Sequence, residues 1–457
     1  RRPTTRRLSA GPAEMAALVV LLGGVMLVWP AFLNGYPLVF SDTGAFLHQV
    51  APPPSGPLVI WDKPHVYGPL LLALSWRVSL WPAVLAQGIM LSWLLWLTQR
   101  TLCGGAVAWR HLVLCLGAAL LTTAPFTAAL LMPDVFTPAV LLAMLLLGFA
   151  AGLTRIEAAA LGTIATVGIA AHLSHLPLAL ALVAFVAAMA GWRAAGRVAL
   201  PMLAALGVLL LSNLWGHGRL TLSPYGATFM LARLQDDGPA TRVIRARCPE
   251  VGWYLCGFVA RLPMDSDEFL WALDSPLNQT ADGTPRHLGG VALAPEARAI
   301  VAETLRSEPF GVAWAMARNT FRQLGLAAAG DTLGPGYLAT ALRPRLAETV
   351  GAADLAAYER ALQPRGTLEA AVAPMLRPHM PVLLLGICGL FIAAWAARGA
   401  VTPGRRGLIY GVLLGFLVNA WATGALSKPH HRYEARLIWL APVLAALAVS
   451  PRMRRPA

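Results

Sequence analysis

Charged side chains are scarce in this sequence of 457 residues, where Asp, Glu, Lys and Arg together make up 13%. Soluble domains carry about 25%. Hydrophobic residues make up 57%, and repeated apolar runs approach the ~20 residues that a helix needs to cross a ~30 Å hydrocarbon core. The low charge therefore excludes an ordinary soluble protein, and we expect an all-α polytopic membrane protein.

Several motifs of well-known enzyme classes are also missing. The sequence contains no GxxxxGK[ST] loop, no HExxH, no GxSxG and no internal repeat. The missing motifs argue against an ATPase, a zinc protease and a serine hydrolase. A transporter ranks below an enzyme, because transporters usually have repeated halves and polar groups near the membrane midplane.

About ten apolar segments are candidates for transmembrane helices. They lie at 15–33, 79–98, 111–132, 135–153, 158–172, 176–191, 197–215, 380–396, 407–425 and 437–450. We interpret the first as a retained span, because no small-residue cleavage site precedes WPAFLNGYP. The segments divide the chain into an N-terminal membrane module at 1–215 (about seven spans, with outer loop 34–78), a mixed, mainly helical extracytoplasmic domain at 216–378, and a C-terminal module at 379–457 (about three spans).

Positive charge is in excess but unevenly distributed. The net charge is +14. If the N-terminus is cytoplasmic, the cytoplasmic segments hold fifteen arginines against Glu14 and Glu157, whereas 216–378 has sixteen arginines and sixteen acids. This pattern follows the positive-inside rule and predicts cytoplasmic termini and no nucleic-acid partner. The Ala- and Arg-rich composition with only two lysines suggests a GC-rich bacterium, hence a multi-pass protein of the inner membrane whose outer side faces the periplasm.

Cysteine is rare, with five residues. Cys248 and Cys256 lie close together in the segment assigned to the periplasm, where an oxidising environment favours a disulfide between them. The other three lie in or beside apolar segments and are expected to be ordinary thiols.

Outer loop 34–78 carries two motifs with candidate functional residues. In FSDTGAFLHQV, Asp42 begins a short amphipathic helix with Phe46 and Val50 on one face; the alternative is that Ser41 or Asp42 only caps this helix. The second motif, WDKPHVYGPLL at 61–71, contains Lys63. Together they place a carboxylate and a cation at the membrane surface.

Three other motifs face the same side. Asp134 follows Pro133 in a short hairpin, and it is either a solvated turn residue or a functional carboxylate. His172 and His175 have i,i+3 spacing, but two ligands do not make a metal site. The segment SKPHHRYEARLIW is unusually basic for an outer loop, which favours an anionic ligand such as a phosphate over a plain interfacial belt; its candidate ligands are Lys428, His430, His431, Arg432, Tyr433 and Arg436.

The first outer loop resembles that of the GT-C superfamily, membrane glycosyltransferases that use polyprenyl-phosphate sugars. The likeness is to protein O-mannosyltransferases and the aminoarabinose transferase of lipid A. It rests on Asp42-Thr43-Gly44-Ala45-Phe46 followed by Lys63-Pro64-His65-Val66-Tyr67, although many members have two adjacent acids where this chain has one. The resemblance implies a GT-C-like fold, Asp42 and Asp134 as catalytic groups, and contacts of Lys63, His65 and Tyr67 with the donor phosphate. A divalent metal stays open as a cofactor, and no other is expected.

The residue types suit this chemistry. A sugar on a lipid phosphate is already activated, so transfer needs a carboxylate to accept the proton of an acceptor hydroxyl and cations to stabilise the departing phosphate. We therefore expect a glycosyltransferase that inverts the anomeric centre, with Asp42 as general base and a glycan, lipid or protein as acceptor. The alternative is a periplasm-facing polymerase or ligase of lipid-linked glycans that uses outer Arg and His residues, and a lipid or solute transporter comes last.

Overall fold

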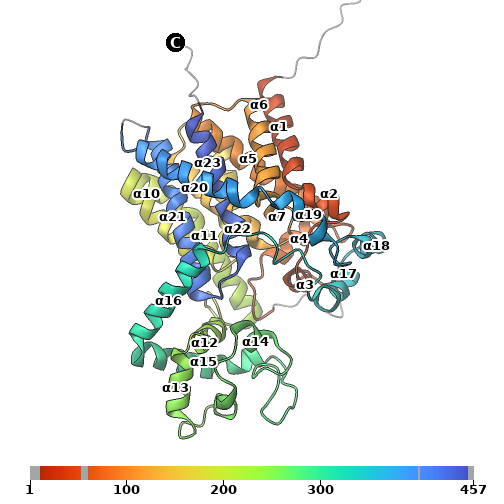
Figure 1. Cartoon of the computed structure of the whole chain (residues 1–457), viewed down its shortest axis with the longest axis vertical. Coiled ribbons are helices and arrows are strands. Elements are labelled where there is room, and N and C mark those ends of the chain that lie inside the picture. Colours follow the sequence, from red (N-terminus) through yellow and green to blue (C-terminus); the bar gives the residue numbers. More distant parts are fainter. Residues whose placement is uncertain (1–10, 53–59, 400–401, 451–457) are drawn as a thin grey trace, which may run out of the picture.

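The computed structural model describes residues 11–52, 60–399 and 402–450. It is all-helical, with 73% of residues in helices, and the described residues form no β-strand, only the isolated bridges Leu38–Leu130 and Gln279–Pro285. Figure 1 shows a layer of long helices above a smaller helical unit, with the start of α1 and the end of α23 at the same end of the molecule.

The apolar segments expected from the sequence coincide with helices. Four of these are long and apolar enough to cross a membrane: α5 (Trp81–Cys103), α11 (Trp192–His217), α20 (His379–Ala396) and α21 (Pro403–Leu426). The other helices of the layer are shorter, namely α1 (Pro12–Leu27), α6 (Ala108–Leu121), α8 (Phe136–Phe149), α9 (Arg155–Ala171), α10 (His175–Ala190) and α23 (Leu440–Val449). Length and composition thus support four candidate spans among the described residues, fewer than the expected ten.

Prolines shorten two of the expected spans. The segment 15–33 is divided between α1 and α2 (Trp29–Asn34), and the segment 111–132 between α6 and α7 (Ala124–Ala128). Pro30 and Pro125 lie in the first turn of α2 and α7. Because proline lacks an N–H and clashes with the preceding turn, each apolar run becomes two helices.

The segment 216–378 divides between two hydrophobic cores. One core is shared by α12 (Gly226–Asp236), α13 (Pro239–Arg247), η2 (Tyr254–Arg261), α14 (Ser266–Trp271), α15 (Gly289–Ser307) and part of α16 (Pro309–Leu324); we call this unit the outer domain. The following elements pack instead into the core of the apolar helices. These are η3 (Leu338–Leu342), α17 (Arg343–Thr349), α18 (Ala352–Arg360) and α19 (Leu368–Leu376).

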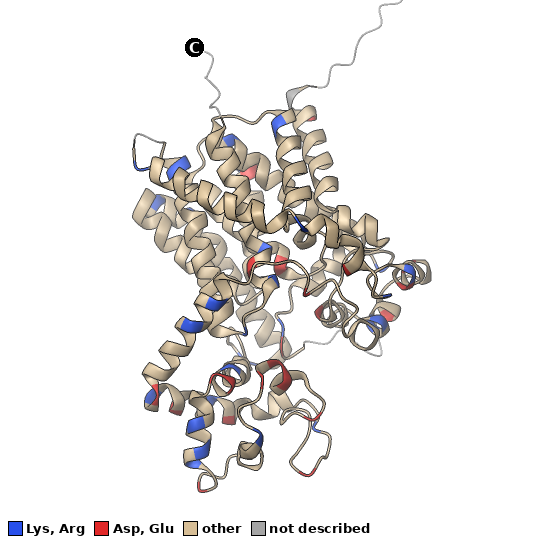
Figure 2. Ribbon diagram, in the orientation of Figure 1, with Lys and Arg blue, Asp and Glu red and all other residues tan. Residues whose placement is uncertain are grey.

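Charged residues follow this division. Figure 2 shows them sparse along the upper helices and numerous in the outer domain. Among the arginines assigned to the cytoplasmic side, Arg100 pairs with Glu157 across 2.7 Å. Some of the arginines assigned to the cytoplasmic side lie outside the described residues, namely Arg1, Arg2, Arg6, Arg7, Arg452, Arg454 and Arg455.

The outer domain contains the expected disulfide, because Cys248 and Cys256 are bonded. The two short helices of the first outer loop, α3 (Ser41–His48) and α4 (Tyr67–Ser75), and the later helix α22 (His431–Ile438) contribute side chains to the core of the apolar helices. Most candidate functional residues lie on or beside these three helices.

Candidate functional site

Helix α3 fixes the position of Asp42. Phe46 is buried on α3, as the pattern predicts, whereas the equally buried Val50 lies two residues beyond the end of the helix at His48. At the start of the helix the backbone N–H of Phe40 donates a hydrogen bond to Thr43 Oγ1, whereas neither Ser41 nor Asp42 makes a side-chain cap. The capping alternative for Asp42 is therefore wrong, and its carboxylate is free for other interactions.

Close backbone packing holds α3 in place. A Cβ atom on Gly44 would lie 2.3 Å from the carbonyl oxygen of Ala341 in η3, so no larger residue fits there without a shift. The hydroxyl of Thr43 donates a hydrogen bond to the carbonyl of Leu131. The helix that carries Asp42 thus contacts η3 through Gly44 and the hairpin that contains Asp134 through Thr43.

Two cations flank the Asp42 carboxylate. Lys63 Nζ lies 3.2 Å from Oδ1 and Arg432 Nη2 lies 3.9 Å from Oδ2, and 31% of the Asp42 side chain is exposed. Lys63 also contacts Asp62 at 2.6 Å. Burial opposes ionisation of Asp42, but the charges of Lys63 and Arg432 outweigh it and lower the pKa of this carboxyl. Asp42 is therefore ionised at neutral pH and partly open to solvent.

Lys63 is held by both acids and by aromatic rings. Burial disfavours its charge, yet Asp42 and Asp62 raise the pKa of the ammonium above its usual range. Its Nζ lies 5.7 Å from the ring centre of Trp271 in the outer domain. The ring centres of Trp271 and Trp61 are in turn 6.2 Å apart. The outer domain therefore reaches the lysine that faces Asp42.

Arg432 has unused hydrogen-bonding capacity. Its guanidinium lies over the rings of Phe40 and Tyr433, at 4.6 and 4.9 Å, and Nη2 donates to the Tyr433 hydroxyl. Its Nη1 atom is buried and has no hydrogen-bond partner among the residues that the structure describes. A cavity of about 20 Å³ between Asp134, Asp331 and Arg432 has room for about one water molecule.

Asp134 and Arg436 form a buried ion pair. Asp134 lies in η1 (Pro133–Val135), and its Oδ1 is 3.2 Å from Arg436 Nη1, with side-chain exposures of 5% and 1%. Arg436 Nη2 also donates to Asn419 of α21 at 3.0 Å. Asp134 is thus paired, and the solvated-turn alternative is wrong. Arg436 therefore links α22 to the hairpin that contains Asp134 and, through Asn419, to α21.

Lys428 and His430 face the outer domain. Lys428 Nζ donates to both oxygens of Asp265, at 2.7 and 2.6 Å, and to Asp267 at 2.9 Å. His430 Nε2 lies 3.3 Å from Asp267. Despite burial, His430 and Lys428 lower the pKa of Asp267 to about 2. We call this group the Lys428 clamp, because it links the end of α21 to α14.

The remaining predicted phosphate contacts are dispersed. Tyr67 is buried and donates its hydroxyl proton to Gln87 Oε1 at 2.7 Å. His65 packs 5.4 Å from the Trp215 ring, and His431 Nδ1 accepts the backbone N–H of Ala328. The structure thus brings Lys63 and Arg432 to Asp42, and holds Tyr67 in the core.

Neither the histidine pair nor the acids offer a ready metal site. His175 is buried with both ring nitrogens bonded, to Thr137 and to the Gly168 carbonyl. Within residues 11–52, 60–399 and 402–450, no group of three or more His, Cys, Asp or Glu side chains is arranged to hold a metal. Asp42 and Asp62 are bridged by Lys63, so they do not fit a divalent ion in this arrangement.

The sequence did not single out several residues that complete the site. Trp61, Asp265, Asp267 and Asn419 all contact predicted residues or their neighbours. Lys63 and Lys428 are the only lysines in the chain, and the fold places each of them between two aspartates. Nothing in the sequence indicated that Lys428 pairs with Asp265 and Asp267.

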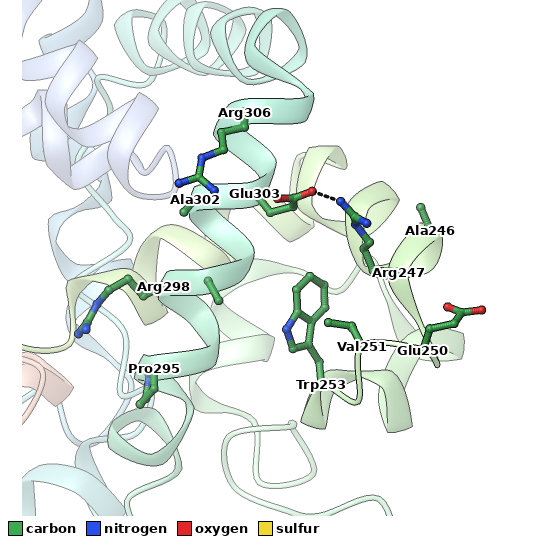
Figure 3. Close-up of a pocket in the computed structure, with 11 residues that line it drawn as sticks. Ala246, Arg247, Glu250, Val251, Trp253, Pro295, Arg298, Ala302, Glu303 and Arg306 are labelled. Carbon is green, nitrogen blue, oxygen red and sulfur yellow. Dashed lines mark hydrogen bonds and ion pairs between the residues drawn. The ribbon is translucent and has the colours of Figure 1, made fainter.

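A wider surface hollow lies elsewhere. It has a volume of about 970 Å³, lies between α13 and α15, and contains none of the predicted site residues. Figure 3 shows Trp253 and Arg247 on one side of it and Arg298 and Arg306 on the other. The Asp42 site is thus a small polar cluster and not part of this open hollow.

Comparison with known proteins adds no further assignment. No family model, no curated protein and no solved structure matches this chain.

Proposed function

We propose that this chain is an integral membrane glycosyltransferase of the GT-C type in a bacterial inner membrane. It transfers a sugar from a polyprenyl-phosphate donor to an acceptor on the periplasmic side. In this proposal about ten helical segments are embedded in the membrane, and both termini lie in the cytoplasm. One observation carries the proposal: a partly exposed, ionised Asp42 lies between Lys63 and Arg432, on the short helix that follows the first apolar segment. A donor with a lipid tail presents its sugar-phosphate bond at this depth.

The reaction is a single displacement at the anomeric carbon. The acceptor oxygen bonds to that carbon as the bond to the phosphate oxygen breaks, and the polyprenyl phosphate leaves with the electron pair. Asp42 takes the proton from the acceptor hydroxyl. Lys63 and Arg432 stabilise the negative charge that develops on the phosphate. The attack comes from the face opposite the phosphate, so the configuration inverts.

Donor binding would make Asp42 a stronger base. With its cations in place, the lowered pKa of Asp42 makes it a weak proton acceptor. A donor phosphate competes for Lys63 and Arg432, because both form charge-assisted hydrogen bonds to phosphate oxygens. As the cations turn toward the phosphate, the Asp42 carboxylate loses compensating charge and its pKa rises. Proton transfer is thereby coupled to the presence of the donor.

Arg432 and Arg436 take different parts in this scheme. The unpartnered Nη1 of Arg432 can donate to a phosphate oxygen. Both Nη atoms of Arg436, the end of its guanidinium, are already bonded, to Asp134 and to Asn419. We assign Arg432 to the donor phosphate and the Asp134–Arg436 pair to positioning α22, from which Arg432 projects.

The donor class is tested in proteoliposomes that contain the purified chain. We expect transfer of a radiolabelled sugar from a polyprenyl-monophosphate donor to an envelope acceptor fraction, and none from a nucleotide sugar. Transfer from a nucleotide sugar in the absence of a lipid donor would contradict the proposal.

The second candidate is a polymerase or ligase of lipid-linked glycans. The free Nη1 of Arg432 favours it as well, because the leaving group there is a polyprenyl pyrophosphate and needs cations more than a base. The same proteoliposomes distinguish the two, since a ligase uses the pyrophosphate-linked glycan and not the monophosphate sugar.

A further inference from the structure

Helix α16 exposes large aromatic side chains along one face. Phe310 is 87% exposed, Trp314 71% and Phe321 74%. Residues spaced by four and eleven positions lie on nearly the same side of an α-helix. The three rings therefore form one stripe, roughly 16 Å long at 1.5 Å per residue.

Such a stripe is unusual on a surface bathed by water. A Phe or Trp side chain buries about 150–250 Å² when covered, and soluble monomers rarely expose contiguous apolar patches above a few hundred Å². The opposite face of α16 packs against the rest of the chain, because Val312, Ala315, Asn319 and Gln323 are buried. The exposed stripe is therefore not needed for packing within the chain.

The position of α16 indicates what covers the stripe. Its second half packs on the last turns of α21, where a Cβ atom on Gly424 would lie 2.6 Å from the Asn319 carbonyl. Gln323 exchanges two hydrogen bonds with the backbone of His430, just beyond α21. From there α16 runs obliquely away from the helix layer toward the outer domain (Figure 1).

Helix α21 also carries exposed apolar side chains. Leu417 and Trp421 of α21 are 52% and 40% exposed, as expected of side chains that face lipid. Arg322 is exposed next to Phe321 and lies in the last turn of α16. Aromatic rings beside arginine are typical of helices at the lipid headgroup level.

We infer that α16 is an interfacial helix whose Phe310–Trp314–Phe321 face lies in the outer leaflet of the membrane, with Arg322 at the lipid phosphates. Phe321, next to α21, lies deepest and Phe310 shallowest. The helix thereby holds the outer domain against the membrane surface. The inference rests on the proposed membrane placement and not on glycosyl transfer.

Spin labelling of the full chain in nanodiscs tests this inference directly. The nanodiscs contain phosphatidylethanolamine and phosphatidylglycerol. Phe310→Cys, Trp314→Cys and Phe321→Cys are labelled in a Cys388→Ser background, which removes the exposed thiol and leaves the buried Cys103 and Cys115. Accessibility to oxygen is compared with accessibility to a water-soluble nickel chelate.

Two controls match the exposure of the test sites. Leu273→Cys in the outer domain is the water control at 87% exposure, and Leu385→Cys on α20 is the lipid control at 74%. We expect oxygen-to-nickel ratios between the two controls that fall from Phe321 to Trp314 to Phe310. Ratios equal to that of Leu273 at all three sites would overturn the inference. So would dipolar broadening between labels on separate molecules, because a second copy would then cover the stripe. Neither readout depends on catalytic activity.

Discussion

The Nζ atom of Lys63 lies 3.2 Å from Oδ1 of Asp42 and 2.6 Å from Oδ2 of Asp62, so one ammonium bridges two carboxylates. The side chain of Lys63 is 13% exposed. Removing it would take a cation from both carboxylates and, under the proposed function, one of the two cations that contact the donor phosphate.

The first prediction concerns this lysine. Lys63→Gln should lower transfer by about 10²–10³-fold, the usual cost of removing one group that stabilises developing charge. The rate is measured with a saturating polyprenyl-phosphate sugar. Lys428→Gln, at the only other lysine, serves as the control and should lower the rate far less. Equal losses in the two variants would contradict a direct role of Lys63 at the phosphate.

The second prediction concerns the buried pair behind the site. Arg436→Met should destabilise the folded chain by about 3–5 kcal/mol, because it leaves the Asp134 carboxylate buried and unpaired. Thermal unfolding in detergent measures the effect. Combining Arg436→Met with Asp134→Asn should restore part of the lost stability. A double variant as unstable as the sum of the single variants would show that the two side chains act independently.

The third prediction concerns the close packing of α3. Gly44→Ala places a methyl group 2.3 Å from the Ala341 carbonyl, so α3 must shift, at a cost of roughly 1–3 kcal/mol. Transfer should fall because Asp42 moves with the helix. Gly162→Ala on α9, where nothing lies within 4 Å, should leave both stability and transfer unchanged. Normal activity in Gly44→Ala would show that the position of α3 is not critical.

The fourth prediction concerns the effect of low pH on the Lys428 clamp. Because the pKa of Asp267 is lowered to about 2, its ion pairs stabilise the fold above the ordinary aspartate pKa of about 3.9 and lose this effect as the pH falls toward 2. The wild type should thus melt at a higher temperature than Lys428→Met, and this difference should have its full size above about pH 4 and become smaller below it. A difference that stays constant down to pH 2.5 would contradict this assignment.

Hydrophobic runs predicted the helices better than the number of spans. Each apolar segment is helical, which is what a membrane segment requires, because in lipid the backbone has to satisfy its own hydrogen bonds. Pro30 and Pro125 nevertheless divided two of the runs. The limits of the outer domain were missed because helices such as α17 and α18 are polar in sequence, yet their Leu346 and Tyr358 pack into the core of the apolar helices.

The candidate site was predictable where residues are close in sequence. The helix that carries Asp42 follows from the spacing of Phe46 and Val50, and a local disulfide from that of Cys248 and Cys256. Pairings across the chain were not predictable from a single sequence. Asp134 and Arg436 are 302 positions apart, and only the fold shows that each neutralises the other. The same holds for Lys428 and Asp265.

The central claim is that Asp42 accepts the proton of the acceptor, and the transfer rate of Asp42→Asn measures this most directly. Asp62→Asn is the matched control, because Asp62 contacts the same lysine. We expect Asp42→Asn to bind the polyprenyl-phosphate donor but to transfer its sugar about 10²–10⁴-fold more slowly, the usual contribution of a general base. Asp62→Asn should retain most of its activity. A folded Asp42→Asn variant that binds the donor and transfers at the wild-type rate would contradict the account.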